Sequence, residues 1–401
     1  MKDANQQGQG DGETRRPNWP SIVPPKRGLA KALFQIKTKS LPVEKDPVPP
    51  QEEPQPLAPE QPYQPPKAAT WQDNPPTDPW CPNTILEHID WAKAHLPENN
   101  FGKHEPAFNG WKVLGATRRG RMHAHNGTHR EDAFAFKTGD CFTVLCVADG
   151  AGSSQLSRIG SELACRELVT NIAKSCDDQR TLLRGANEAT LANALGETLS
   201  QNVHKTLETF HDLATKTKVP LSDFRCTILL TLLYEGDKAS VAVVGQVGDG
   251  FIGFAERTGF RRLESSASGD FSGEVKCFMP DDKTSEYFTE SLLKCGSMIK
   301  DGLIRVSNLE AVLLCTDGIE DPFFPIETNL EKLFSQLKNG FSEPLEDFAY
   351  EETILPLPPA LNSPKGKDIL EKWLSFQKRG ENDDRTILVI YREAGLGLDK
   401  S

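Results

Sequence analysis

The 401-residue sequence lacks several features that would each indicate a particular class of protein. Basic residues are in the minority: 46 Lys and Arg stand against 57 Asp and Glu, a formal net charge of −11. Because nucleic-acid phosphates attract a basic face, this balance argues against a nucleic-acid partner. A run of about 18 apolar residues, the length of a membrane-spanning helix, is also missing, so we expect no membrane partner.

Paired cysteines are absent as well. Nine cysteines are scattered without a Cys-x-x-Cys pair, and several lie inside apolar runs where a reduced thiol acts as a small hydrophobe, among them Cys146, Cys226 and Cys315. This distribution indicates a reducing compartment and not a disulfide framework. The opening residues MKDANQQGQGDGE contain no apolar stretch typical of a secretory signal, so we expect a cytoplasmic protein.

Proline is concentrated at the start of the chain, where 17 of the 29 prolines fall within residues 1–80. A Pro/Gln/Glu-rich segment cannot offset its ordering entropy by burial, so residues 1–80 are predicted to be a disordered tail. Residues 83–394 are predicted to form one folded domain, followed by a flexible end at 395–401. Within the tail, RGLAKALFQIKTK (27–39) has a short apolar face flanked by lysines. It is either a frayed helix in a linker or a docking segment that folds on a partner.

The folded part alternates between apolar, strand-like runs and a few helical patterns. Helices are predicted at 83–96, at roughly 155–175 and along the stripe from Leu191 to Phe210. Strands are predicted at 112–116, 133–136, 141–148, 226–234, 239–247, 251–255, 311–315 and 386–391. Because strands follow one another in pairs, we predict an α+β fold of two antiparallel sheets with helices packed outside. The polar stretch at about 340–380, including the loop ILPLPPALNSPKG, is interpreted as an insertion, either decoration or a lid.

Carboxylates recur where these apolar runs begin or end. The positions are Glu131, Asp132, Asp149, Asp249, Asp317, Asp383 and Asp384, and three of the aspartates are followed by glycine. A single Asp-Gly is usually a hairpin turn, but the repetition would bring several acids together at the rims of adjacent strands. Clustered carboxylates repel one another unless a cation neutralises them. Oxygen ligands without a Cys/His pattern indicate Mg²⁺ or Mn²⁺.

Six motifs occur in an order that resembles the metal-dependent protein serine/threonine phosphatases of type 2C, the PPM family, in its bacterial branch. They are GRMHAHNGTHREDAF (120–134), VADGAGS (147–153), CTILL (226–230), VGDGFIG (247–253), CTDGIEDP (315–322) and NDDRTILVI (382–390). The resemblance extends from Trp111 to Arg392. It implies an α-β-β-α sandwich of two antiparallel sheets flanked by helices, with a two-metal centre between the sheets.

The resemblance also implies roles for the recurring acids. The implied metal ligands are the carboxylates of Asp132, Asp149, Asp317 and Asp383 and the backbone carbonyl of Gly150. Asp249 and Asp321 resemble residues that form a weaker third metal site in some members. Glu131 matches a residue that holds metal-coordinated water. In the implied reaction, a hydroxide that bridges two Mn²⁺ or Mg²⁺ ions attacks the phosphorus in line, without a phospho-enzyme.

The sequence departs from the family at the position of a phosphate-binding arginine. Many members carry this arginine four residues before the glutamate, where this chain has Gly127. The nearest cations, Arg130 and Arg121, are therefore the candidates for binding the substrate phosphate.

A second departure concerns the general acid. Eukaryotic members have a histidine directly after Asp-Gly, where this chain has Ala151. His123 and His129 are the available substitutes, although either could serve only a structural hydrogen bond.

The sequence is therefore predicted to encode a Mn²⁺- or Mg²⁺-dependent phosphatase for phosphoserine and phosphothreonine in proteins. Its partner would be a phosphorylated protein, such as a bacterial Ser/Thr kinase or the target of that kinase. The alternative is a catalytically weak domain that binds or senses a phosphorylated regulatory partner. A third alternative is the hydrolysis of a small phosphorylated regulator. Retention of all the acids favours the enzyme.

Overall fold

The computed structural model describes residues 72–89, 100–263, 277–278, 304–305, 309–341, 348–349 and 355–392. The chain divides into two units, 1–67 and 68–401, and all the described residues belong to the second. The segments predicted to dock a partner (27–39) and to form a flexible end (395–401) lie outside the described residues. In the described ranges, no helix combines the length and apolarity needed to cross a bilayer.

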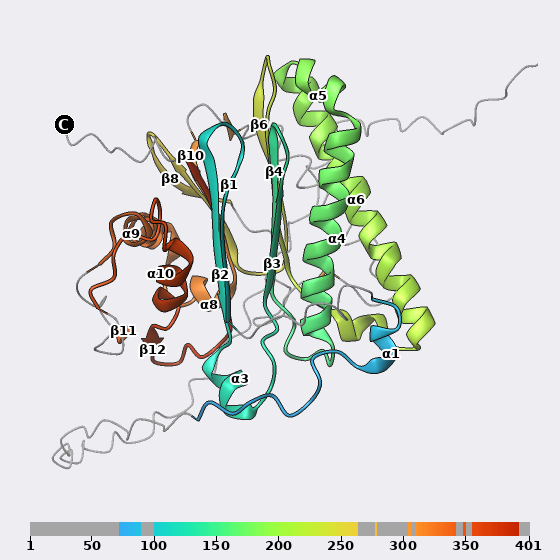
Figure 1. Cartoon of the computed structure of the whole chain (residues 1–401), viewed down its shortest axis with the longest axis vertical. Coiled ribbons are helices and arrows are strands. Elements are labelled where there is room, and N and C mark those ends of the chain that lie inside the picture. The colour runs from blue at the N-terminus through green and yellow to red at the C-terminus, as the bar shows by residue number, and fades with distance from the viewer. Residues whose placement is uncertain are drawn as a thin grey trace, which may run out of the picture. The chain divides into compact units, whose positions relative to one another are not determined.

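Two antiparallel sheets form the centre of the domain (Figure 1). The first has the order β1 (Asn100–Pro106), β2 (Trp111–Arg118), β13 (Arg385–Arg392), β10 (Leu309–Cys315), β7 (Phe251–Glu256) and β8 (Gly259–Arg262). The second has the order β3 (Ala133–Thr138), β4 (Phe142–Ala148), β5 (Ile228–Glu235), β6 (Ser240–Val247) and β9 (Ile304–Arg305). The predicted pair of antiparallel sheets is confirmed.

Helices cover the outer face of each sheet, as Figure 1 shows. Against the second sheet lie α4 (Ser157–Asp178) and α6 (Glu188–Thr217), joined by α5 (Arg180–Gly185). Against the first sheet lie α9 (Ile326–Asn339) and α10 (Gly366–Trp373). The short elements are α1 (Asn83–Leu86), α3 (Arg121–Asn126), α8 (Asp317–Glu320), the 3-10 turns Phe108–Gly110 and Leu221–Phe224, and the ribbon of β11 (Phe348–Ala349) with β12 (Gln377–Lys378). The fold is therefore the expected α-β-β-α sandwich.

Three apolar layers hold the sandwich together. In β4, Cys146 packs with the helices of its sheet while Leu145 and Val147 pack between the two sheets. Strand β10 behaves in the same way, with Leu313 facing its helices and Val312 facing the other sheet. Because successive side chains point to opposite faces, strands buried on both faces are largely apolar. The acids therefore lie where these strands begin or end.

The stretch 340–380 differs from its interpretation as an insertion. It contains α10, whose Ile369, Leu370 and Trp373 are buried against β1 and β2. Leu361 and Phe376 are buried in the same layer. The predicted loop character of ILPLPPALNSPKG is correct for residues 355–365. The described residues of this stretch therefore belong to the outer layer of the first sheet.

The predicted boundary of the tail at residue 80 is wrong. Residues 72–80, which we call the strap, lie on the domain and are held by hydrogen bonds to its backbone. Asn74 N donates to Ala124 O (2.9 Å), and Thr77 N donates to Gly127 O (3.0 Å). Trp80 is buried in the core between α4 and the second sheet. The helix predicted at 83–96 is described only to residue 89, and α1 covers Asn83–Leu86.

Candidate functional site

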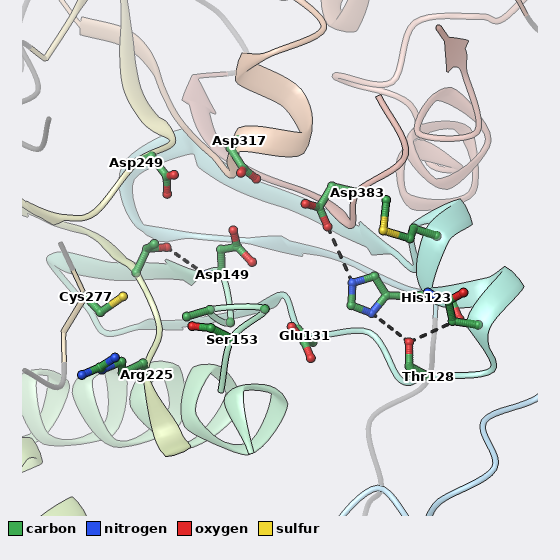
Figure 2. A pocket seen from close by; sticks show the side chains of 16 residues that line it. His123, Thr128, Glu131, Asp149, Ser153, Arg225, Asp249, Cys277, Asp317 and Asp383 are labelled. Atoms are coloured by element: carbon green, nitrogen blue, oxygen red, sulfur yellow. Dashed lines mark hydrogen bonds and ion pairs between the residues drawn. The ribbon is translucent and has the colours of Figure 1, made fainter. Parts of the chain in front are cut away.

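A cavity of 580 Å³ opens at the edge of the sandwich where the acids gather (Figure 2). Neighbouring strands are antiparallel, so the end of one strand lies beside the start of the next. This arrangement brings four segments to one edge of the sandwich. They are the residue after β4, the β6–β7 turn, the two residues after β10 and the residues before β13. The acids that line the cavity are Glu131, Asp149, Asp249, Asp317 and Asp383.

Three aspartates form the centre of this cluster. One carboxylate oxygen from each of Asp149, Asp249 and Asp317 lies within 4.8 Å of the others. The structure thus groups Asp249, expected at a weaker third site, with two of the expected main ligands. Asp132 lies beneath them, 2% exposed, and its Oδ2 accepts a hydrogen bond from Thr316 Oγ1 (2.9 Å).

Burial and the proximity of these carboxyls to one another raise their pKa values. Burial, with repulsion from Asp249 and Asp383, raises the pKa of Asp317 from 3.8 to about 8. Burial, with repulsion from Asp384, raises the pKa of Asp132 from 3.8 to about 7. The pKa of Asp149 is raised well above 3.8, first by burial and then by Asp132 and Asp317. Without a cation, this edge of the sheets resists full ionisation.

The residues fit a divalent metal centre. Asp132 Oδ1 and Asp317 Oδ1 are buried and have no hydrogen-bond partner among the described residues. A buried carboxylate oxygen is costly unless a hydrogen bond or a cation satisfies it. A set of carboxylates without cysteine or histidine at its centre suits Mg²⁺ or Mn²⁺.

Two groups of residues fix the acids in place, a role that the sequence alone did not predict for them. Asp384 is 1% exposed, and its carboxylate accepts hydrogen bonds from Gly120 N (2.5 Å) and Glu131 N (2.6 Å). Asp384 is therefore an anchor for the backbone that precedes Asp132. Its neighbour Asp383 is the exposed carboxylate that lines the cavity.

Threonines tie the strand ends together. Thr386 N donates to Thr316 Oγ1 (3.0 Å), while Thr316 N donates to Thr386 O (3.1 Å), which joins β10 to β13. Asp149 N donates to Thr227 Oγ1 (3.0 Å), and Thr227 N donates to Asp149 O (2.7 Å). Thr316 follows an apolar strand and directly precedes Asp317, a pattern that could have marked it in the sequence, whereas Thr227 and Thr386 have no aspartate beside them in the sequence.

Gly150 and Glu131 are in close contact beside the aspartates. A Cβ atom at Gly150 would lie 2.8 Å from Ser157 Cβ and 2.9 Å from Glu131 Cβ, so no side chain fits there. Burial raises the pKa of Glu131 to about 7, despite the opposing effect of His123. The structure therefore places the expected water-holding glutamate at the cavity wall, next to the expected carbonyl ligand.

His123 reaches the cavity from α3. Its Nδ1 lies 2.8 Å from His129 O, which directs Nε2 toward Asp383 Oδ1 at 3.7 Å (Figure 2). Burial alone would lower the pKa of His123, but the carboxylates of Asp384, Glu131 and Asp383 outweigh burial and raise it. His123 therefore tends to carry a proton at the cavity.

The other expected cations do not line the cavity. Arg130 is 6% exposed, and in extended chain its side chain points away from that of Glu131. Arg121 opens α3 without joining the cavity lining. His129 Nε2 pairs with Asp78 O in the strap (2.7 Å), and Asp321, at the end of α8, stays outside the lining. The proposed phosphate role of Arg130 and Arg121 thus has no support in this geometry.

The chain is similar to known proteins both in a family-specific sequence pattern and in its fold. The family model described as protein phosphatase 2C matches residues 119–374. No curated protein matches the sequence. Among solved structures, a bacterial serine phosphatase is 14% identical with a TM-score of 0.39, covering 70% of this chain and 97% of that one. Serine-threonine phosphatase 2C from Toxoplasma gondii is 13% identical with a TM-score of 0.43, covering 74% and 99%. The S. agalactiae serine/threonine phosphatase is 14% identical with a TM-score of 0.40, covering 71% and 100%.

The matched range includes the second sheet, strands β7, β8 and β10 of the first sheet, and the acids from Asp132 to Asp317. The chain therefore belongs to the protein phosphatase 2C family and is a protein serine/threonine phosphatase of that class.

Proposed function

We propose that the protein hydrolyses phosphoserine and phosphothreonine in phosphorylated proteins with the help of two Mn²⁺ or Mg²⁺ ions. The observation that carries this proposal is the pair of buried, unsatisfied carboxylate oxygens, Asp132 Oδ1 and Asp317 Oδ1, under an acid-lined cavity. The substrate would be a target of a Ser/Thr kinase, or the kinase itself, in the same cytoplasm.

The acids of the sheet edge would hold the ions. Asp132, Asp149, Asp317 and Asp383 would bind through carboxylates and Gly150 through its carbonyl, while Asp249 lies close enough to join Asp149 and Asp317. Two bound ions would neutralise the phosphoryl oxygens and lower the pKa of a water molecule.

Side chains around the acids would handle protons. Glu131, with a pKa of about 7, can accept a proton from the attacking water. As the water oxygen bonds to phosphorus, the bond from phosphorus to the seryl or threonyl oxygen breaks. His123, held by His129 O and protonated beside the carboxylates, can deliver a proton to the departing oxygen.

The test is turnover of p-nitrophenyl phosphate and of a phosphothreonine peptide by the purified protein, with Mn²⁺ and with a chelator. We expect turnover of both substrates with Mn²⁺, its loss with chelator and its return when Mn²⁺ is restored. Undiminished turnover after exhaustive metal removal would refute the role of the ions. Tight binding of the phosphopeptide without turnover would favour a sensing domain instead.

A further inference from the structure

One wall of the cavity, formed by the segment before β5, carries an arginine. Among the described residues, Arg225 is the one arginine or lysine that lines the cavity. Figure 2 shows it on the side of Ser153 and Cys277, with His123 and Thr128 on the opposite side. The cavity therefore has acids at its centre, an arginine on one wall and a histidine on the other.

The backbone holds Arg225 in a fixed position relative to the expected metal ligands. Ala151 N donates to Arg225 O (3.0 Å), and Gly150 forms an antiparallel bridge with Cys226. The mutual hydrogen bonds of Asp149 and Thr227 continue this pairing. Arg225 is thus tied to the loop that carries the central aspartate and not to a free surface segment.

Arg225 lies at the end of a turn whose neighbouring residues are buried. It directly follows the 3-10 turn Leu221–Phe224, and Phe224 and Cys226 are completely buried in the core between α4, α6 and the second sheet. Arg225 itself is partly exposed and contributes to the cavity lining.

Position 127, where many family members carry the phosphate-binding arginine, is a glycine in this chain and does not accommodate an arginine. Gly127 ends α3 in the left-handed conformation with φ of 66°, which disfavours a side chain. The strap also covers the position, because a Cβ at Gly127 would lie 3.2 Å from Pro75 O. An arginine at this position would be strained and would meet the strap.

We propose that Arg225 binds the phosphoryl group of the substrate, an inference that rests on the proposed phosphatase function. A guanidinium presents two parallel N–H donors that match two phosphate oxygens. With the phosphoryl oxygens held at the Arg225 wall, the seryl or threonyl oxygen would face the opposite wall, where His123 lies. Arg225 thus compensates for the arginine that position 127 lacks.

The experiment compares wild type with Arg225→Ala and Arg225→Lys in the full, Mn²⁺-loaded protein. Calorimetric titration with inorganic phosphate measures the affinity directly, and KM is measured for p-nitrophenyl phosphate and for a phosphothreonine peptide. A hydrogen bond to a charged group corresponds to about 10- to 100-fold, so Arg225→Ala should weaken phosphate binding and raise both KM values by that range. Arg225→Lys should lie between, because it keeps the charge and loses the fork.

Arg184→Ala is the matched control, since Arg184 is an exposed arginine paired with Asp237 away from the cavity. It should leave all three values unchanged. Unchanged phosphate affinity in Arg225→Ala would overturn the proposal, even if the KM for the peptide alone increased. A wild-type protein that binds no phosphate would also overturn the proposal. Because the titration needs no turnover, it decides the role of Arg225 separately from the phosphatase assay.

Discussion

Replacing Asp317 with Asn tests whether the acids at the sheet edge repel one another when no cation is bound. Burial and the neighbours Asp249 and Asp383 raise the pKa of Asp317 from 3.8 to about 8. Between these values the native state binds more protons than the unfolded state. The free energy of unfolding of the metal-free protein therefore falls as the pH rises from about 4 to about 8, by at most about 1.4 kcal/mol per pH unit for this group.

The full interval of about four pH units sets an upper bound of about 6 kcal/mol for the penalty at pH 8. Since one amide relieves only part of a repulsion shared among several acids, we expect Asp317→Asn to stabilise the metal-free protein by about 2 kcal/mol at pH 8. For a domain of about 300 residues this corresponds to a rise in Tm of roughly 3 °C. At pH 4 the gain should disappear, because the carboxyl is then protonated in the native state.

The assay is thermal unfolding of metal-stripped wild type, Asp317→Asn and Asp212→Asn across this pH range. Asp212 lies exposed on α6, so its variant should follow wild type at every pH. Added Mn²⁺ should raise the Tm of wild type more than that of Asp317→Asn. A metal-free Asp317→Asn protein that is no more stable than wild type at pH 8 would refute the reasoning.

Three further predictions concern the surroundings of the acids. Removal of residues 1–71 should leave Tm and turnover of p-nitrophenyl phosphate nearly unchanged, whereas removal of 1–80 should lower Tm in thermal unfolding, because the strap and buried Trp80 are lost. His123→Ala should slow a phosphothreonine peptide more than p-nitrophenyl phosphate, whose leaving group needs no proton; equal kcat losses would assign His123 a structural role. Asp384→Ala should lower the free energy of unfolding by about 1–3 kcal/mol in denaturant titration, because buried backbone N–H groups lose their acceptor.

The sequence was most informative where strands are buried on both faces. The runs that became β4, β5, β6 and β10 are largely apolar, so their existence and the acids at their ends could be predicted. Strand β1 was missed because NFGKHEP is a polar strand at a sheet edge. Helix α9 was missed although Ile326, Leu330, Leu333 and Leu337 repeat with helical spacing.

The strap and Arg225 could not be predicted for a different reason. Proline-rich composition indicated disorder up to residue 80, but order in residues 72–80 comes from hydrogen bonds to distant backbone atoms. A distant side chain adds to these bonds, because Arg158 Nε donates to Trp80 O (2.6 Å). The position of Arg225 in the cavity wall depends on the pairing of its backbone with Ala151, which is a contact between segments distant in the sequence.

The most direct test of the central claim is phosphate release from a phosphothreonine peptide by Asp149→Asn at saturating Mn²⁺, compared with wild type. Asp149 lies at the centre of the acid cluster, and a neutral amide would hold divalent cations there much more weakly than a carboxylate. We predict that turnover falls by orders of magnitude while the metal-free variant remains folded and at least as stable as wild type. Near-normal turnover by the folded variant would contradict the assignment of the site.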